Sequence, residues 1–213
     1  VGGLLMPLYI GRQNVLTSPM TFLQRPVRWL QGISKYGVTI SGGPNFAFQL
    51  CVDKIRDNEL EGLDLSTWEI AFNGAEPIRA ATLKSFTEKF EQCGFRRSAF
   101  LPCYGMAETT LIVTGGPAET RPVLTTFDRG GLDEKIVRPV QADNENARTL
   151  VGCGTVLPDE KVIIVDPSTR RILPSDSIGE IWVQSPSVGQ GYYQRKDATL
   201  RTFHATTIDG DGP

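Results

Sequence analysis

The sequence predicts an α/β fold, in which a mainly parallel sheet with flanking helices is followed by a smaller all-β lobe with the character of a distorted barrel. Two observations lead to this prediction. Up to residue 116, the pattern of strand, glycine turn and helix occurs three times, and this alternation is typical of parallel sheets covered by helices. After residue 150, short β-branched runs alternate with turn residues, as they do in all-β lobes.

The composition excludes several classes of protein. The chain of 213 residues has 40% hydrophobic and 22% charged residues, which is enough apolar material for one large domain or two small ones. A net charge of −2 gives no electrostatic reason to expect a nucleic-acid partner. No apolar run approaches the roughly 20 residues of a membrane span. We therefore expect neither nucleic-acid binding nor a membrane span.

The four cysteines and the single histidine are not expected to form a metal site. No two cysteines are arranged as a C-x-x-C pair, which structural zinc sites usually need. Three of the cysteines lie in apolar surroundings, which suits reduced core thiols. These features predict a cytoplasmic protein.

The first repeat begins after an apolar segment at residues 4–10, which we expect to be buried. Ser18 and Pro19 can open a helical region, and apolar residues at helical spacing then predict a helix between Pro26 and Gly37. A β-branched strand follows at residues 38–41. After a glycine turn, a largely buried helix is predicted from Phe46 to about Arg56.

The second repeat begins with an alternation of apolar and polar residues from Trp68 to Asn73, which is typical of a strand. A glycine turn follows, and Pro77 fits the first position of the next helix. Leu83, Phe86 and Phe90 recur on one face of that helix. The pattern therefore predicts a strand, a turn and an amphipathic helix.

The third repeat consists of a strand at residues 98–104, a turn at Gly105 and the start of a further helix. In parallel sheets, ligands bind beyond the carboxyl ends of the strands. The glycine loops at residues 42–46, 74–77 and 104–110 all lie at such ends. We therefore expect these loops to contribute to one pocket.

The expected organisation has four parts. They are an α/β lobe at residues 1–116 that carries the three loops, a polar insertion at 117–150 with one short helix after Asp128, a β lobe at 151–203, and an irregular tail at 204–213. In the β lobe, strands are predicted at residues 161–165 and 179–184, with a turn at 166–169 between them.

The loop at residues 104–110 holds a tyrosine, a carboxylate and two hydroxyls. The ring of Tyr104 is suited to packing on a flat base, Glu108 to holding a divalent metal, and the N–H groups of the following helix to facing phosphate. The alternative is a buried tyrosine and a glutamate that complements the helix dipole. Taken alone, the loop fits this structural alternative better, because short motifs often recur by chance.

The other two loops have similar alternatives. At residues 74–77, glycine permits the close backbone approach that a stacked ring needs, but an ordinary strand-to-helix turn uses the same residue types. At residues 42–48, Phe46 and Phe48 could line an apolar tunnel or could belong to a rigid turn with core aromatics. The order and spacing of the loops together favour a ligand site.

Other motifs carry no predicted chemistry. Residues 179–183 and 189–192 contain glycines of the kind that is common in β lobes, so we assign them a structural role. His204 has no serine or cysteine nucleophile near it in the sequence. The sequence also lacks a Walker-type phosphate loop and a G-x-G-x-x-G turn after a strand, which argues against P-loop NTPases and Rossmann dehydrogenases.

The order of the motifs resembles that of the adenylate-forming superfamily, which includes acyl-CoA synthetases, luciferases and the adenylation domains of nonribosomal peptide synthetases. The chain is most similar to the fatty acyl-AMP ligases within it. Three features carry this likeness: the run Gly-Gly-Pro-Asn-Phe-Ala-Phe at residues 42–48, Ala107 where most of the superfamily has threonine, and the polar stretch at 117–150. The resemblance covers essentially the whole chain.

The resemblance implies roles for the residues that match the family's motifs. It implies nucleotide binding by Gly74, Ala75, Glu76, Pro77, Tyr104, Gly105 and Met106. It implies acyl-chain binding by Gly42, Gly43, Pro44, Asn45 and Phe46. It also implies catalytic roles for Glu108 and Thr109, with Glu108 holding the Mg²⁺ on ATP. Ala107 removes a hydroxyl that most of the superfamily has in this loop.

The implied reaction uses ATP and Mg²⁺ to convert a fatty acid into acyl-AMP and pyrophosphate, and then transfers the acyl group to an acyl carrier protein or carrier domain. The family's phosphate loop is expected before Val1, and its Arg-Thr-Gly-Asp segment and C-terminal lid after Pro213, so the chain is expected to be inactive alone. Two alternatives stay open. One is an acyl-CoA synthetase or nonribosomal peptide synthetase adenylation domain, and the other is a non-catalytic scaffold that binds acyl chains or nucleotides.

Overall fold

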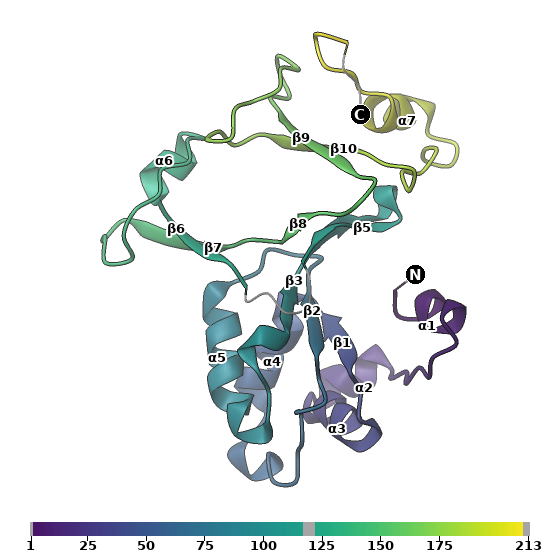
Figure 1. Cartoon of the computed structure of the whole chain (residues 1–213), viewed down its shortest axis with the longest axis vertical. Coiled ribbons are helices and arrows are strands. Elements are labelled where there is room, and N and C mark those ends of the chain that lie inside the picture. The colour runs from purple at the N-terminus through teal and green to yellow at the C-terminus, as the bar shows by residue number, and fades with distance from the viewer. Residues whose placement is uncertain (1, 117–121, 211–213) are drawn as a thin grey trace. The chain divides into compact units, whose positions relative to one another are not determined.

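The computed structural model describes residues 2–116 and 122–210 (Figure 1). The chain divides into two compact units. Unit 1 comprises Val1–Tyr104, Gly115–Val123 and Val151–Gly154, and unit 2 comprises Gly105–Thr114, Leu124–Leu150 and Thr155–Pro213. The first residues of the expected polar insertion (117–121) and the last residues of the expected tail (211–213) lie outside the described residues.

Unit 1 is built on a sheet of three parallel strands in the order β1-β2-β3. The strands are β1 (Ile40–Gly43), β2 (Ile70–Asn73) and β3 (Phe100–Pro102). The α-helices are α1 (Leu5–Tyr9), α2 (Pro19–Gln24), α3 (Val27–Tyr36), α4 (Asn45–Lys54) and α5 (Ala80–Phe90), and the 3-10 turns are η1 (Asp57–Glu59), η2 (Glu91–Cys93) and η3 (Arg97–Ala99). The predicted parallel sheet with flanking helices is therefore confirmed (Figure 1).

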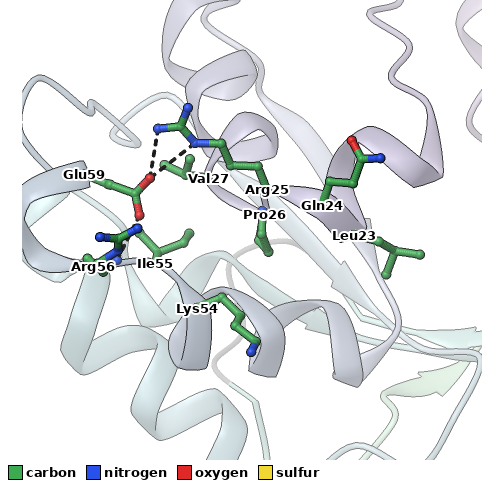
Figure 2. Close-up of a pocket in the computed structure, with 9 residues that line it drawn as sticks. All are labelled: Leu23, Gln24, Arg25, Pro26, Val27, Lys54, Ile55, Arg56 and Glu59. Atoms are coloured by element: carbon green, nitrogen blue, oxygen red, sulfur yellow. Dashed lines mark hydrogen bonds and ion pairs between the residues drawn. The ribbon is translucent and has the colours of Figure 1, made fainter.

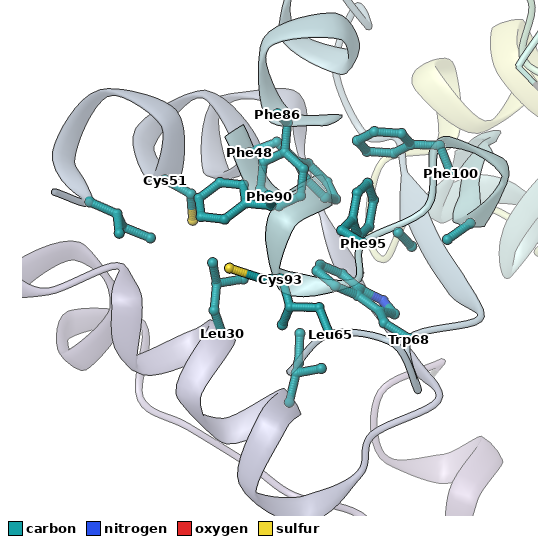
Figure 3. Close-up of a cluster of buried hydrophobic side chains, with 14 of the residues drawn as sticks. Leu30, Phe48, Cys51, Leu65, Trp68, Phe86, Phe90, Cys93, Phe95 and Phe100 are labelled. Carbon is teal, nitrogen blue, oxygen red and sulfur yellow. The ribbon is translucent and has the colours of Figure 1, made fainter. Parts of the chain in front are cut away.

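The core of unit 1 is a cluster of aromatic rings contributed by the helices and by the chain next to the strands (Figure 3). Phe86 is fully buried on α5, and its ring lies 4.5 Å from that of Phe90 and 4.9 Å from that of Phe95, between centroids. The rings of Phe48, Trp68 and Phe100 complete its surroundings. Most of these pairs meet edge to face, which is a favoured aromatic geometry. The predicted apolar face of α5 is thus confirmed.

Two local expectations in unit 1 are wrong. Helix α5 begins at Ala80 and not at Pro77, because Ala75 adopts a left-handed conformation (φ 65°) and the chain stays irregular up to Arg79. The segment at residues 4–10 was expected to be buried, yet Leu5 is 58% and Tyr9 92% exposed. Among the described residues, no other segment covers α1, so its apolar side chains stay exposed.

The cysteines belong to this unit and are free thiols. Cys51 is fully buried on α4, and this burial raises the pKa of its thiol to about 12. Burial also raises the thiol pKa of Cys93, Cys103 and Cys153. Because the thiolate is the reactive form, these cysteines are poor nucleophiles near neutral pH.

Unit 2 contains short sheets and two helices. Its strands are β4 (Tyr104–Met106, which starts at the last residue of a unit 1 segment), β5 (Leu111–Gly115), β6 (Leu124–Asp128), β7 (Ala147–Val151), β8 (Thr155–Val156), β9 (Lys161–Val165) and β10 (Glu180–Gln184). Its remaining elements are the 3-10 turn η4 (Ala107–Thr109) and the helices α6 (Arg129–Asp133) and α7 (Lys196–Phe203). Strands β4, β5 and β8 form one sheet, β6 pairs with β7, and β9 pairs with β10.

The sheets of unit 2 agree with the expected β lobe only in part. Strands β9 and β10 are antiparallel and match the predicted strands, and the side chain of Asp128 accepts a hydrogen bond from the N–H of Gly131 at 2.6 Å at the start of the predicted short helix. However, the strands of the described ranges form separate sheets and no closed barrel. Helix α7 also lies in the segment that was expected to be all-β. The fold is therefore a mixed α/β fold with one parallel sheet and further small sheets.

Within the described ranges, every helix is too short or too polar to span a membrane.

Candidate functional site

The loops at residues 42–46 and 74–77 meet in unit 1, at the carboxyl ends of β1 and β2. These strands are neighbours in the sheet, with Gly43 opposite Asn73. The backbone N–H of Phe46 donates a hydrogen bond to Oε1 of Glu76 at 2.5 Å. The structure therefore brings together the loop predicted to bind the acyl chain and the loop predicted to bind the nucleotide.

The Glu76 carboxylate lies at the amino terminus of α4, where Phe46 is among the first residues of the helix. The first N–H groups of a helix have no partner within the helix, and the helix dipole favours a negative charge there. Glu76 is exposed to solvent. One oxygen of its carboxylate accepts the hydrogen bond from the backbone, while the side chain remains at the surface. Its contact couples the two loops physically.

Asn45 holds the same junction from inside the protein. It is only 6% exposed, and its Oδ1 accepts a hydrogen bond from the N–H of Arg79 at 3.0 Å. Its Nδ2 donates to Oγ1 of Thr82 at 3.3 Å, and Thr82 in turn donates to Gln49 at 2.8 Å. The buried Asn45 side chain is thus satisfied by protein groups. Phe46, which is 49% exposed, is the residue of this loop that presents a large apolar surface.

Close packing at the end of β2 explains why the second loop begins with glycine. A Cβ atom on Gly74 would lie 2.8 Å from the carbonyl oxygen of Cys103, which is closer than a side chain allows. The N–H of Cys103 donates to the carbonyl of Asn73 at 2.9 Å, so the chain after β3 continues along the chain after β2. Gly74 therefore fixes the approach of the two segments.

Asn73, which precedes the loop at residues 74–77, was not among the predicted site residues. It is fully buried, and neither its Nδ2 nor its Oδ1 has a hydrogen-bond partner among the described residues. Such groups usually bind protein, water or a ligand, because leaving them unpaired is costly. The sequence signal that could have drawn attention to Asn73 is its position, since it is the last residue of β2 and shares the buried face of Ala71.

An apolar hollow lies beside β1. It has a volume of about 750 Å³ and is lined from α1, the following segment, α3, β1 and Phe72. The large apolar residues in its lining include Met6, Ile10, Trp29, Ile33, Tyr36 and Phe72. Gly42 is the one residue of the predicted acyl-binding set that lines this hollow, whereas the other four do not.

A second hollow of unit 1 has a volume of about 460 Å³ and lies between the α2–α3 junction and the end of α4 (Figure 2). Arg25 and Glu59 form an ion pair across it at 3.0 Å. A hydrogen bond from the backbone of Arg56 and the contact with Arg25 lower the pKa of the Glu59 carboxyl. No residue of the predicted site lines this hollow, so it adds nothing to the candidate site.

In unit 2, the loop from Gly105 to Thr110 does not lead into an α-helix, contrary to expectation. The chain makes one 3-10 turn, η4, and reverses into β5. A Cβ atom on Gly105 would lie 1.6 Å from the carbonyl oxygen of Leu111, so the two strands approach closely. Thr110 and Leu111 have positive φ angles of 56° and 115°. This reversal removes the helix amino terminus that was expected to face phosphate.

Glu108 and Thr109 lie on this tight turn. The Glu108 carboxylate is partly exposed, and its Oε1 accepts a hydrogen bond from the hydroxyl of Tyr192. This bond lowers the pKa of the Glu108 carboxyl and raises that of the Tyr192 hydroxyl, so Glu108 is ionised at neutral pH. Thr109 is only 3% exposed, and its hydroxyl donates to the carbonyl of Met106 at 3.1 Å. Of the two side chains, Glu108 is the one available to a ligand.

A distant segment fixes the turn in place. Ser187 donates from Oγ to the carbonyl of Thr109 at 2.8 Å, and Thr110 donates from Oγ1 to the carbonyl of Ser187 at 2.5 Å. The N–H of Gly189 donates to the carbonyl of Glu108 at 2.7 Å. Sequence reasoning gave residues 189–192 a structural role and missed this contact, because nothing in the local pattern links segments so far apart in the chain.

The donor set of the turn is compatible with one particular kind of metal site. Among the described residues, no three His, Cys, Asp or Glu side chains gather in a group that could hold a metal ion by themselves. Glu108 offers one ionised carboxylate. Mg²⁺ is commonly bound through one or two carboxylates together with substrate phosphates and water, so Glu108 fits a magnesium ion that arrives with a nucleotide.

Tyr104 and Ala75 are the remaining side chains of the predicted nucleotide set to be placed. Tyr104 is partly buried and is the first residue of β4. Ala75 is exposed at the tip of its loop. The structure thus presents the predicted residues in two groups, one in unit 1 that ends with Tyr104 and one in unit 2 that begins with Gly105.

Comparison with known proteins gives consistent matches over the whole chain. A family model described as AMP-binding enzyme matches residues 1–193. A medium-chain-fatty-acid–[acyl-carrier-protein] ligase, TtuA from Teredinibacter turnerae, is 41% identical over 97% of this chain and 32% of its own length. A second ligase of the same description, JamA from Moorena producens, is 44% identical over 100% of this chain and 36% of its own length.

A solved structure shows the same likeness in three dimensions. The fatty acyl-adenylate ligase from L. pneumophila, crystallised with acyl adenylate and pyrophosphate, superimposes with a TM-score of 0.90 at 44% identity, covering 94% of this chain and 35% of the other. The chain thus spans about a third of the length of the relatives that it matches.

Proposed function

This chain belongs to the AMP-binding enzyme family, and on that premise we propose that it forms part of an ATP-dependent ligase that activates a fatty acid as an acyl-adenylate for transfer to an acyl carrier protein. The observation that carries the proposal is the hydrogen bond between Phe46 and Glu76. It joins the loop assigned to the acyl chain to the loop assigned to the nucleotide, and a reaction between the two substrates requires both to be held at one place.

Unit 1 supplies the binding groups in this proposal. The exposed loop at residues 74–77 borders the adenine and ribose, and Tyr104 packs on the base. Residues 42–46 line the acyl tunnel, with Phe46 as its exposed apolar member. The hollow beside β1 shares Gly42 with this set and has an apolar lining, which suits a hydrocarbon chain because burying each CH₂ group stabilises the complex by about 0.8 kcal/mol.

Unit 2 supplies the group that meets the phosphates. The Glu108 carboxylate would hold Mg²⁺, and the bound ion would neutralise charge on the phosphate oxygens. Thr109 acts through its place on the turn, since its hydroxyl is engaged with the carbonyl of Met106. Ala107 adds no hydroxyl, so the loop relies on Glu108 as its polar side chain toward the nucleotide.

The chemistry proceeds by in-line displacement. A carboxylate oxygen of the fatty acid forms a bond to the α-phosphorus of ATP, and the bond between that phosphorus and the oxygen of the β-phosphate breaks. Acyl-AMP and pyrophosphate result. Such reactions depend mainly on positioning and on electrostatic stabilisation of the phosphate oxygens. The chain spans about a third of the length of the relatives that it matches, so we expect it to form no acyl-AMP at a useful rate by itself.

The test uses the complete protein in which this chain occurs. Pyrophosphate release is measured with ATP, Mg²⁺ and saturated fatty acids of increasing length, and the product is trapped with hydroxylamine as the acyl hydroxamate. Release that depends on one range of chain lengths supports the proposal. A complete protein that binds ATP but releases no pyrophosphate with any acid indicates a non-catalytic scaffold and overturns it.

The acceptor is tested separately by offering an acyl carrier protein or free coenzyme A after adenylate formation. We expect transfer to the carrier protein, because both relatives named above are described as acyl-carrier-protein ligases. Efficient formation of acyl-CoA would favour an acyl-CoA synthetase. Hydroxamate formation by residues 1–213 alone would contradict the expected inactivity of the isolated chain.

A further inference from the structure

Tyr192 is the one side chain outside the predicted set that bonds directly to the Glu108 carboxylate among the described residues. We infer that Tyr192 is a positioning residue, whose hydroxyl holds the carboxylate in the orientation in which it meets the magnesium ion of bound nucleotide. This inference rests on the proposed function and adds to it a residue from a segment that had been given only a structural role.

The ring of Tyr192 is fixed by its own neighbours in unit 2. Its backbone N–H donates to Oγ1 of Thr199 at 2.9 Å, and its ring meets that of Phe203 edge to face at 5.1 Å between centroids. Both neighbours lie on α7. Because both the backbone and the ring of Tyr192 are held by α7, its hydroxyl can orient its acceptor, whereas a mobile one could not.

The backbone of the Glu108 turn is held by the same segment. Gly189 bonds to the carbonyl of Glu108 itself, and Ser187 bonds to the carbonyl of Thr109. Oγ of Ser187 also lies 3.4 Å from Oε1 of Glu160, the residue that precedes β9. Carboxylate and backbone are therefore positioned together by residues 187–192.

A side chain that hydrogen-bonds to a metal ligand changes the affinity of the site for the metal. A hydrogen bond to one oxygen of a carboxylate fixes the direction of the other, and loss of such a partner typically weakens metal binding or activity by about 10- to 100-fold. Because Glu108 is the only predicted protein ligand, any loss of its orientation affects the site directly.

The experiment compares Tyr192→Phe with Tyr193→Phe in the complete protein. Tyr193 is the next residue in the chain, is 88% exposed, and accepts a hydrogen bond only from Gln194 among the described contacts, so it is a matched control for loss of a tyrosine hydroxyl. The probe is Mn²⁺ with α,β-methylene-ATP, which cannot release pyrophosphate. Binding of Mn²⁺ is measured by electron paramagnetic resonance, independently of activity.

We expect Tyr192→Phe to weaken Mn²⁺ binding by about 10-fold and Tyr193→Phe to change it by less than about 2-fold. In a Glu108→Gln background, Tyr192→Phe should add little further loss, because residues that act through one another are not additive. Equal effects of the two phenylalanine variants, or an undiminished effect of Tyr192→Phe in the Glu108→Gln background, would overturn the inference.

Two further outcomes are separated by the same experiment. If the wild-type protein binds no Mn²⁺–nucleotide and releases no pyrophosphate, the proposed function fails. If the wild type binds and Tyr192→Phe binds equally well, only the positioning role fails. Should Tyr192→Phe unfold, Ser187→Ala replaces it. A loss of about 3-fold in Mn²⁺ affinity, as expected for one neutral hydrogen bond, supports the positioning of the Glu108 turn by residues 187–192. An unchanged affinity contradicts this positioning.

Discussion

The loops of unit 1 and the turn of unit 2 are supported in different ways. The loops at residues 42–46 and 74–77 extend from strands that lie beside a core of buried aromatic rings. The turn at residues 105–110 is held by hydrogen bonds from residues 187–192, and in the described part of unit 2 only Val113 and Val165 are buried hydrophobic residues. Burial therefore positions the first pair of loops, and polar contacts position the turn.

This difference predicts different consequences of mutation. Burial of apolar surface contributes to the stability of a whole unit, whereas a hydrogen bond on an exposed turn contributes little to stability but fixes local geometry. Substitutions under the unit 1 loops should therefore lower the free energy of unfolding. Substitutions at the unit 2 turn should instead affect magnesium binding and adenylate formation.

The largest expected effect is that of Phe86→Ala in the core of unit 1. Its fully buried ring contacts five other aromatic rings, and replacement by alanine should lower the free energy of unfolding by about 3–5 kcal/mol. Urea unfolding followed by tryptophan fluorescence measures this change. Phe46→Ala is the control, because that ring is 49% exposed and its loss should cost less than about 1 kcal/mol. Similar losses for the two variants would mean that the aromatic core does not determine stability.

The next effect is that of Gly105→Ala in the turn of unit 2. The new Cβ would collide with the backbone of Leu111, and relieving such overpacking costs about 1–3 kcal/mol. If the turn moves to relieve it, adenylate formation should fall by roughly 10- to 100-fold, which pyrophosphate release measures. Gly152→Ala is the control, because a Cβ there would lie no closer than 3.5 Å to its neighbours, which is an ordinary contact. Unchanged activity of Gly105→Ala would show that the turn tolerates displacement.

The same contrast explains what the sequence could predict. The parallel sheet and the apolar face of α5 follow from periodicity and from the rules of strand connection, so they were predicted correctly. The meeting of the loops at β1 and β2 followed from the parallel sheet, since carboxyl ends of parallel strands share an edge. These features depend on local patterns that burial imposes along the chain.

The turn of unit 2 could not be predicted in this way. A glycine after a strand usually opens a helix in α/β folds, yet here Gly105 permits close approach to Leu111 and the chain reverses. The contact between Glu108 and Tyr192 depends on tertiary structure and leaves no periodic signal. Polar contacts between distant segments therefore determine the part of the site that sequence patterns missed.

A smaller effect is expected for Glu76→Gln, which tests whether the unit 1 loops also need a polar contact. Removing the charge at the amino terminus of α4 should lower the free energy of unfolding by about 0.5–1 kcal/mol and raise the KM for the fatty acid. Glu88→Gln is the control, because Glu88 forms only an exposed pair with Lys84 at 3.7 Å and pairs of that kind contribute about 0.3–0.5 kcal/mol. An unchanged KM for Glu76→Gln would show that the two loops act independently.

The smallest effect concerns the turn after β9, where Asp166 makes only exposed polar contacts. Hydrogen bonds from the Ser168 hydroxyl at 2.5 Å and from the N–H groups of Thr169 and Ser168 at 2.9 and 2.8 Å hold the pKa of the Asp166 carboxyl at about 2, whereas an unfolded chain has a value of about 3.9. Because the pKa is lower in the folded state, the stabilisation is present above pH 4 and is lost as the pH falls from about 4 to 2.

Asp166→Asn keeps the shape of the side chain but cannot ionise, so it should be slightly less stable than the wild type at pH 6, and the difference should shrink as the pH approaches 3. Ser168→Ala removes the strongest donor and should give an intermediate dependence. Urea midpoints at several pH values measure both variants. A difference between wild type and Asp166→Asn that stays constant from pH 6 to pH 3 would contradict this prediction, because it would mean that the charged state of the turn does not contribute to the stability of unit 2.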